Sequence, residues 1–178
     1  MAFDWPWLIV ERPRAQMLTR IAAADIGKEL RVVDRLVVSV DGACSGRRCA
    51  CAAILMCNGR IVAEASQSVP LAGGYVLGAE IAAVALAAQL ADHGGDTVAI
   101  TIETDNPMVP RVIAQGYRPP QSKRIPSRPL AIASAFAQRR GVTFNWLPRN
   151  ATPGLLRAHR LASRRLWAFR RRRCNHLV

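Results

Sequence analysis

The sequence predicts an α/β fold in which helices flank a mixed five-stranded sheet, in the order β-β-β-α-β-α-α-β-α. Short runs rich in β-branched residues alternate with longer runs dominated by alanine and leucine. These patterns are typical of strands and helices respectively. The first three strand-like runs follow one another directly, which predicts an antiparallel meander. The later ones are separated by helical runs, which predicts parallel strands.

The first half of the domain is predicted to contain strands at residues 35–40, 49–57 and 60–69, followed by a helix. Asn58-Gly59 separates the second and third strands, and this dipeptide is a strong signal for a tight hairpin. Residues 77–93 consist almost wholly of alanine, leucine, valine and isoleucine. So apolar a run, closed by two glycines, predicts a buried helix.

The second half alternates between strands and helices. Residues 97–104 are β-branched and alternate in polarity, which predicts a fourth strand, and residues 142–147 are predicted to form the fifth. Helices are predicted at residues 106–115, 130–140 and 153–173. A basic loop rich in proline precedes the second of these helices.

The 178 residues fit one domain with short extensions. We expect an N-terminal extension of unknown role at residues 1–34, with a helix-like stretch at 15–24, then the main folded domain at residues 35–165 and a basic tail at 166–178. No apolar stretch reaches the ~20 residues that cross a bilayer, and the N-terminus does not resemble a signal peptide. We therefore expect an intracellular, cytoplasmic protein without a membrane partner.

Charge is divided unevenly along the chain, whose net charge is +13. All 12 acidic residues lie at or before Asp105. Nine of the 25 lysines and arginines also lie in that part, which leaves 16 basic and no acidic residues in 106–178. Such a polycation favours a nucleic acid partner, because basic groups release counterions from phosphates. A merely solvated basic face is the alternative.

The five cysteines do not have the spacing of a structural zinc site, since paired C-x-x-C clusters are absent from the sequence. Cys49, Cys51 and Cys57 share one parity along an apolar run. We therefore interpret them as small core residues on one face of a strand, which fits a reducing compartment.

Three acids punctuate the predicted elements. Asp41 ends the first strand, Glu80 lies near the start of the first long helix, and Asp105 ends the fourth strand. Side chains at the carboxyl ends of parallel strands converge at one edge of a sheet. Three converging carboxylates repel one another unless cations bind, so the pattern indicates a two-metal site for phosphoryl transfer.

With these acids in place, the sequence resembles the type 1 branch of the ribonuclease H family. The resemblance spans residues 35–165 and gains its specificity from the order of its segments on the predicted elements. These segments are residues 38–46 (VSVDGACSG), 53–55 (AIL), 78–80 (GAE), 102–106 (IETDN), 146–153 (WLPRNATP) and 157–162 (RAHRLA).

The resemblance implies an endonuclease that hydrolyses the RNA strand of RNA-DNA hybrids and leaves 5′-phosphate and 3′-hydroxyl ends. It implies that Asp41, Glu80 and Asp105 bind two Mg²⁺ or Mn²⁺ ions. His159 falls at the position of the family's fourth acid, so we expect it to be the fourth catalytic and metal-binding residue. Asn150 falls where many members carry a mobile histidine.

Substrate-binding residues are expected in four places: the loop around residue 47, the basic loop 118–129, the segment after the fifth strand, and the basic tail. The family's loop asparagines that bond 2′-hydroxyls are absent here, at residues 46–51 and 72–78. In the tail, Trp167 and Phe169 among arginines suit a nucleic acid contact, with packing on the body as the alternative. The expected nucleic-acid-binding residues are Arg47, Arg48, Arg118, Lys123, Arg124, Arg128, Arg149, Asn150, Arg170 and Arg171.

Two other functions remain open at this stage. A nuclease with the same carboxylates could cut structured DNA, such as a branched junction, because one fold hosts several activities. A binding module with a decayed active site is the other, because the fourth acid and the loop histidine are both replaced.

Overall fold

The computed structural model describes residues 35–69, 75–91, 99–120 and 125–174, with the side chains of the last helix described to residue 168. Five strands form one sheet in the order β3-β2-β1-β4-β5. The meander of β1, β2 and β3 is antiparallel, whereas β4 pairs in parallel with both β1 and β5. The strands are β1 (Arg35–Ser45), β2 (Arg48–Cys57), β3 (Arg60–Val69), β4 (Ala99–Thr104) and β5 (Thr143–Trp146).

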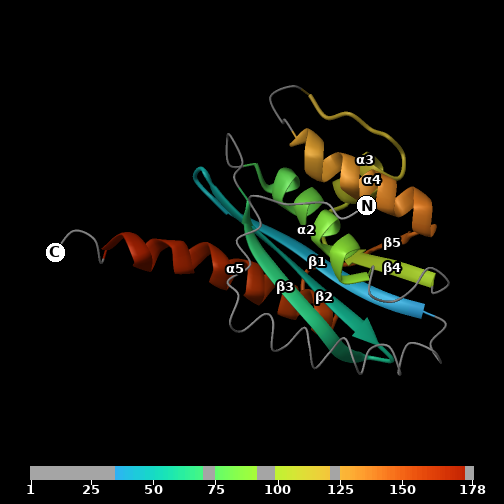
Figure 1. Cartoon of the computed structure of the whole chain (residues 1–178), viewed down its shortest axis with the longest axis horizontal. Helices are drawn as coiled ribbons and strands as arrows, with labels where there is room; N and C mark the ends of the chain where they lie inside the picture. Colours follow the sequence, from blue (N-terminus) through green and yellow to red (C-terminus); the bar gives the residue numbers. More distant parts are fainter. Residues whose placement is uncertain (1–34, 70–74, 92–98, 121–124, 175–178) are drawn as a thin grey trace.

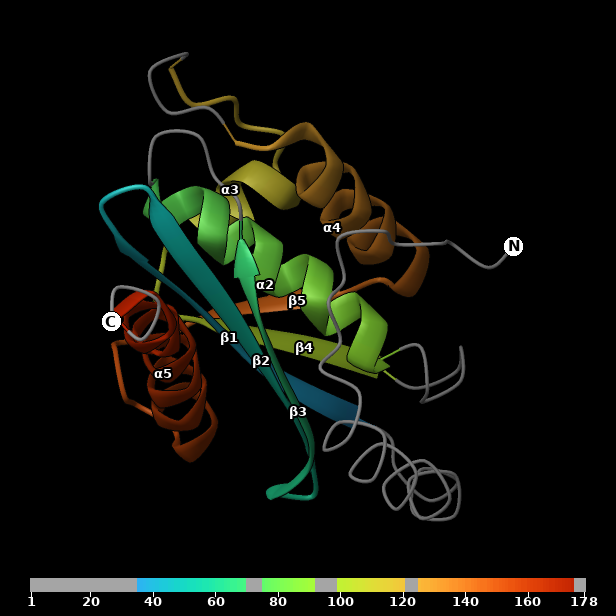
Figure 2. The same cartoon turned by 60° about the vertical axis from the view of Figure 1, so that its left-hand side comes forward.

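Helices cover both faces of the sheet (Figures 1 and 2). The helices α2, α3 and α4 lie on one face, and α5 lies on the other and projects beyond the end of the sheet. None of the described helices combines the length and apolar composition needed to cross a bilayer. The helices are α2 (Val76–Ala91), α3 (Met108–Ile113), α4 (Ser127–Arg140) and α5 (Pro153–Cys174).

Alternation along β1 separates two layers of different character. Leu36, Val38 and Val40 are buried in the main core beneath α2. Successive strand residues point to opposite faces, so the residues between them turn toward α5. On that side a much smaller cluster, which includes Val37 and Leu161, packs under the helix. The polar Ser39 and Asp41 follow Val37 on this same face and are buried as well.

The start of α5 is fixed against β1 by polar contacts and a close approach. Thr152 precedes the helix, and its hydroxyl accepts a hydrogen bond from the Leu155 N–H at 3.2 Å, as an N-cap does. Gly154 lies so near β1 that a Cβ atom there would overlap Ser39 Oγ. One turn later, Arg157 donates two hydrogen bonds of 2.8 Å to Glu64 on β3.

The order of elements from residue 35 onward is confirmed, but several predicted bounds were wrong. The first strand runs to Ser45 instead of residue 40, because its pairing with β2 continues to Ser45 opposite Arg48. The helix expected at 106–115 spans Met108–Ile113, since the Asn106 side chain accepts a bond from the Met108 N–H. The helix expected at 130–140 begins earlier, at Ser127.

The remaining differences are small. The strand expected at 142–147 spans Thr143–Trp146, and the last helix ends at Cys174 instead of residue 173. The ends of the predicted helix 77–93 and strand 97–104 extend into residues outside the described ranges, as does the helix-like stretch at 15–24.

Cys49, Cys51 and Cys57 are all buried in the main core, as their shared parity predicts. A disulfide joins Cys44 to Cys49, a pairing that the sequence did not predict. These two cysteines are partners in the register of β1 and β2, which brings their side chains together. The bond ties the two strands at the base of the hairpin tip formed by residues 45–48.

Candidate metal centre

Three carboxylates converge at the edge of the sheet. Asp41 lies in β1, Asp105 directly follows the neighbouring β4, and Glu80 reaches them from the first half of α2. One carboxylate oxygen from each lies within 4.8 Å of the others. The structure therefore brings together the three acids that the sequence predicted as metal ligands.

Gly42 is the residue that lets α2 approach β1 this closely. A Cβ atom at Gly42 would lie 2.5 Å from the backbone nitrogen of Glu80 and 2.6 Å from the carbonyl carbon of Ala79. Real Cβ atoms do not approach so near, so the contact requires glycine. The Gly42 N–H also donates to the Glu80 carboxylate. The sequence placed this glycine beside Asp41, but the approach depends on a helix almost forty residues away.

Burial makes the carboxylates hard to ionise. The Asp41 and Glu80 side chains are almost fully buried, and burial raises the pKa of Asp41 to about 6. Burial likewise raises the pKa of Glu80 well above its ordinary value, and the nearby Asp41 and Asp105 raise it further. One Glu80 oxygen, Oε2, has no hydrogen-bond partner. A buried acceptor without a donor is costly, and a cation would relieve that cost.

Two potentially cationic side chains border this cluster. The Nε atom of Arg149 lies 2.7 Å from Asp105 Oδ2, with the arginine 61% exposed and the aspartate only 9%. The Nδ1 atom of His159 lies 3.3 Å from Asp41 Oδ2. Arg149 lies in the loop between β5 and α5. Trp146, the last residue of β5 before this loop, donates from Nε1 to the Asp105 carbonyl at 3.2 Å and so holds the start of the loop at the site. The structure thus places His159 beside the acids, as its position in the helix predicts.

A buried polar layer beneath the cluster was missed. Glu103 Oε2 accepts hydrogen bonds of 2.7 Å from Ser39 and 2.8 Å from Thr152. Ser39 and Glu103 are register partners, and each lies two residues before an acid of the cluster. The alternation of β4 was the available signal, because Glu103 and Asp105 must face the same side.

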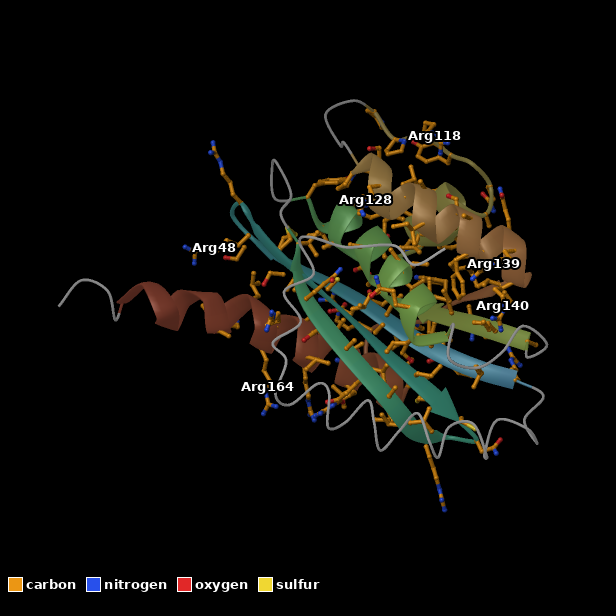
Figure 3. The ribbon with its side chains drawn as sticks, viewed as in Figure 1. Arg48, Arg118, Arg128, Arg139, Arg140 and Arg164 are labelled. Carbon is orange, nitrogen blue, oxygen red and sulfur yellow. A yellow bond between two sulfur atoms is a disulfide. The ribbon has the colours of Figure 1, made fainter. Side chains whose placement is uncertain are left out.

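The expected nucleic-acid-binding residues lie in several places (Figure 3). Arg47 is exposed at the hairpin tip and Arg48 is partly buried beside it. Arg118 and Arg128 are exposed near the start of α4, away from Arg139 and Arg140 at its other end. Asn150 is exposed next to Arg149 and adopts a positive φ of 63°. Outside the described residues or side chains lie Lys123, Arg124, Arg170 and Arg171.

The donor set suits a divalent cation. Carboxylate oxygens are the ligands that Mg²⁺ and Mn²⁺ prefer, and Asp41, Glu80 and Asp105 supply them at mutual distances that one ion could bridge. The imidazole of His159 is a softer donor at the border of the set. The acids converge in a largely buried site, and Glu80 Oε2 has no hydrogen-bond partner there. A bound cation would compensate their negative charge, which the protein interior alone does not.

Comparisons with known proteins agree with this architecture. No protein-family model matches the chain, and no curated protein sequence matches it. Among solved structures, the RNase H1 of Halobacterium salinarum NRC-1 is 24% identical, with a TM-score of 0.62 over 74% of this chain and 97% of that one. The N-terminal RNase H domain of a Mycobacterium tuberculosis protein is 19% identical, with a TM-score of 0.63 over 75% and 94%.

A third structure is similar in the same way. LC11-RNase H1, isolated from compost by a metagenomic approach, is 17% identical, with a TM-score of 0.61 over 75% of this chain and 96% of that one. Each of these proteins is thus covered almost completely by about three quarters of this chain. The likeness, together with the strand order β3-β2-β1-β4-β5, shows that the chain has the fold of the type 1 ribonucleases H.

Proposed function

We propose that the protein is a divalent-metal-dependent endonuclease that hydrolyses the RNA strand of RNA-DNA hybrids and leaves 5′-phosphate and 3′-hydroxyl ends. The observation that carries this proposal is the cluster of Asp41, Glu80 and Asp105, whose ligand oxygens lie within 4.8 Å of one another. A similar fold alone would not support an activity, because function depends on the site. Here the fold and an intact acidic triad occur together.

Two solved complexes support nucleic acid as the substrate class. A separate structure of LC11-RNase H1 was solved in complex with an RNA/DNA hybrid; it is 16% identical to this chain, with a TM-score of 0.59. The foamy viral protease-reverse transcriptase, 18% identical, was solved with double-stranded DNA and has a TM-score of 0.52. We propose an RNA-DNA hybrid as the substrate of this chain as well. The segment after Asp105 contains 16 basic residues and no acidic residue, and this positive charge suits the phosphates of a nucleic acid.

In this proposal Asp41, Glu80 and Asp105 hold two Mg²⁺ or Mn²⁺ ions. Bound divalent cations supply Lewis acidity for the attacking water and for the departing 3′ oxygen. His159 supplies a further ligand or a hydrogen bond to Asp41. Arg149 keeps positive charge beside Asp105, where the scissile phosphate must approach. The exposed arginines of the hairpin tip and α4 bind substrate phosphates.

A cleavage assay tests the proposal. Purified protein is incubated with a uniformly labelled hybrid, duplex RNA, duplex DNA and a four-way junction, each with Mg²⁺ and with Mn²⁺. We expect the RNA strand of the hybrid to be cut, and Asp105→Asn to lower turnover by orders of magnitude without unfolding the protein. Cutting of the junction with the hybrid untouched would replace the proposal with a structured-DNA nuclease.

One observation favours a second candidate, a nucleic-acid-binding protein without catalysis. Arg149 forms a 2.7 Å ion pair with Asp105, so that one of the three acids already has a counter-ion from the protein itself. The sequence also contains no acid beyond Asp105 that could supply a fourth carboxylate. Binding of the hybrid without cleavage of any substrate, under either metal, would support this candidate over the nuclease.

A further inference from the structure

A hollow lies between the hairpin tip and the outer part of α5. Its lining comprises Ser45 and Arg48 from the hairpin and Leu166 and Trp167 from the helix, and it encloses about 250 Å³. The side chain of Trp167 is 52% exposed, one of the largest apolar exposures in the described residues. Figure 3 shows Arg48 at the hairpin end beside α5. Nothing in the proposed hydrolysis uses this hollow.

The hollow lies between the same strand and helix that contain Asp41 and His159, nearer the C-terminal ends of both elements. Along α5, Trp167 follows His159 by eight residues, which is about 12 Å at the rise of an α-helix. Along β1, Ser45 follows Asp41 by four residues, which is about 13 Å in a strand. His159 contacts Asp41 and Trp167 shares the hollow with Ser45, so α5 and β1 run side by side here. Both elements therefore give the same distance between the metal centre and the hollow.

The lining combines an aromatic face with a cation. Aromatic rings bind nucleobases by stacking, and arginine binds phosphate through its planar fork. Two further arginines, Arg160 and Arg164, are exposed on the same helix outside the lining of the hollow, and the sequence has no acid after Asp105. An aromatic ring and a guanidinium in a basic surface are complementary to a nucleotide, with its flat base and its anionic phosphate.

A base inside a duplex does not offer its face to a side chain, since both of its faces stack on neighbouring base pairs. An unpaired base has free faces and can be bound by stacking on an aromatic residue. The occupant that fits the hollow is therefore an unpaired nucleotide. At about 12 to 13 Å from the metal centre, the hollow lies beyond the phosphate being cut, at a distance where one strand can have left the duplex.

We propose that the hollow is a secondary site that binds one unpaired nucleotide of a strand extending from the substrate duplex, with the base on Trp167 and the phosphate at Arg48. This inference rests on the proposed function only in taking a nucleic acid duplex as the ligand. It makes the protein prefer a hybrid with a single-stranded extension over a blunt hybrid of the same sequence.

The test measures binding without cleavage, by fluorescence anisotropy in EDTA. The probes are a blunt hybrid and the same hybrid with a short extension at each of its ends in turn, on the RNA or on the DNA strand. We expect one extension to tighten binding at least about fivefold over the blunt hybrid, the lower range of base–aromatic stacking. Trp167→Ala should bring the ratio of the two dissociation constants to one, and Trp167→Phe should retain most of it.

Arg160→Ala is the matched control, because it removes an exposed arginine of α5 that does not line the hollow. It should weaken both probes and leave their ratio unchanged. A wild-type ratio near one for every extension, or a ratio that survives Trp167→Ala, would overturn the secondary site. Neither result depends on cleavage, so a protein that binds extended hybrids through Trp167 but cuts none would refute the nuclease and keep the site.

Discussion

Two of the three acids of the metal centre, Asp41 and Glu80, are costly to ionise in the fold that contains them. Asp41 and Glu80 are buried against each other, and each must be ionised to bind a metal. The raised pKa values of both groups show the cost, because ionisation in a buried site is opposed by lost hydration and by neighbouring negative charge. Charged groups kept at such a cost are typical of functional sites.

The first prediction concerns Asp41 in the metal-free protein. Because its pKa rises from 3.8 to about 6 on folding, the native state retains a proton that the unfolded chain has released. The free energy of unfolding should therefore fall as the pH rises through this range. Asp41→Asn should stabilise the metal-free protein at pH 7 by about 1 to 3 kcal/mol while abolishing cleavage. Urea unfolding in EDTA at pH 4.5 and pH 7.5 checks this, and a variant less stable than the parent at pH 7.5 would contradict it.

The second prediction concerns Arg149, which pairs with Asp105. A cation must compete with this guanidinium for the carboxylate, although solvent screens the exposed arginine. Arg149→Ala should therefore tighten Mn²⁺ binding about two- to fivefold, as measured by titration calorimetry. Arg157→Ala is the control, because it removes an arginine that pairs with Glu64 on β3 instead. Weaker Mn²⁺ binding in Arg149→Ala alone would mean that the arginine supports the metal site.

The sequence could reveal those site residues whose location in the fold follows from their position along a strand. Asp41 and Asp105 each lie two residues after the register partners Ser39 and Glu103 of neighbouring parallel strands, so their convergence follows from topology. The pair of Arg149 and Asp105 spans 44 residues and depends on the course of the loop after β5, which no local pattern encodes. The sequence assigned Arg149 to nucleic acid, and that role stays a prediction beside its observed contact.

At the scale of elements, the placement of α5 decides whether His159 and the loop before it reach the acids. Thr152 both caps the helix at Leu155 and donates to the buried Glu103. Glu103 in turn accepts from Ser39 on β1. One hydroxyl thus links the start of α5 to two strands of the sheet.

The third prediction follows from this link. Thr152→Val keeps the shape of the side chain but removes the hydroxyl, so the helix loses its cap and Glu103 loses a donor. We expect the free energy of unfolding to fall by about 1 to 3 kcal/mol, measured by urea denaturation. Thr152→Ser, which keeps the hydroxyl, should lose less than half as much. A larger loss in Thr152→Ser than in Thr152→Val would show that the methyl group, and not the link to Glu103, stabilises this junction.

The starts of α3 and α4 were predicted wrongly, and proline explains the second case. Pro129 is the third residue of α4, and the sequence placed the helix start after it. The first N–H groups of a helix have no partner within it, so proline costs nothing there. Pro110 occupies the same position in α3. By contrast, Asn58 and Gly59 both adopt the positive φ that their hairpin turn requires, as predicted.

In the molecule as a whole, the acidic and the basic side chains are concentrated in different parts of the fold. The acids that matter for chemistry are gathered at one edge of the sheet, whereas the arginines extend from the hairpin tip along α5 and over the start of α4 (Figure 3). The helix α5 projects past the sheet (Figure 1), and the exposed Arg160 and Arg164 lie on this helix. For the proposed hybrid substrate, a duplex long enough to reach this helix would gain phosphate contacts from these arginines.

The last prediction measures how much of binding comes from this extension. Each phosphate neutralised by a basic side chain adds about 0.7 to 0.9 to the steepness with which log affinity falls with log salt. Deleting residues 170–178 removes four arginines, so the slope for a long hybrid should flatten by that amount for every phosphate that the tail neutralises in the intact protein. A hybrid too short to reach the end of α5 is the control, because its slope should not change. An unchanged slope for the long hybrid would mean that the tail is merely solvated, and that binding rests on the basic loop 118–129 instead.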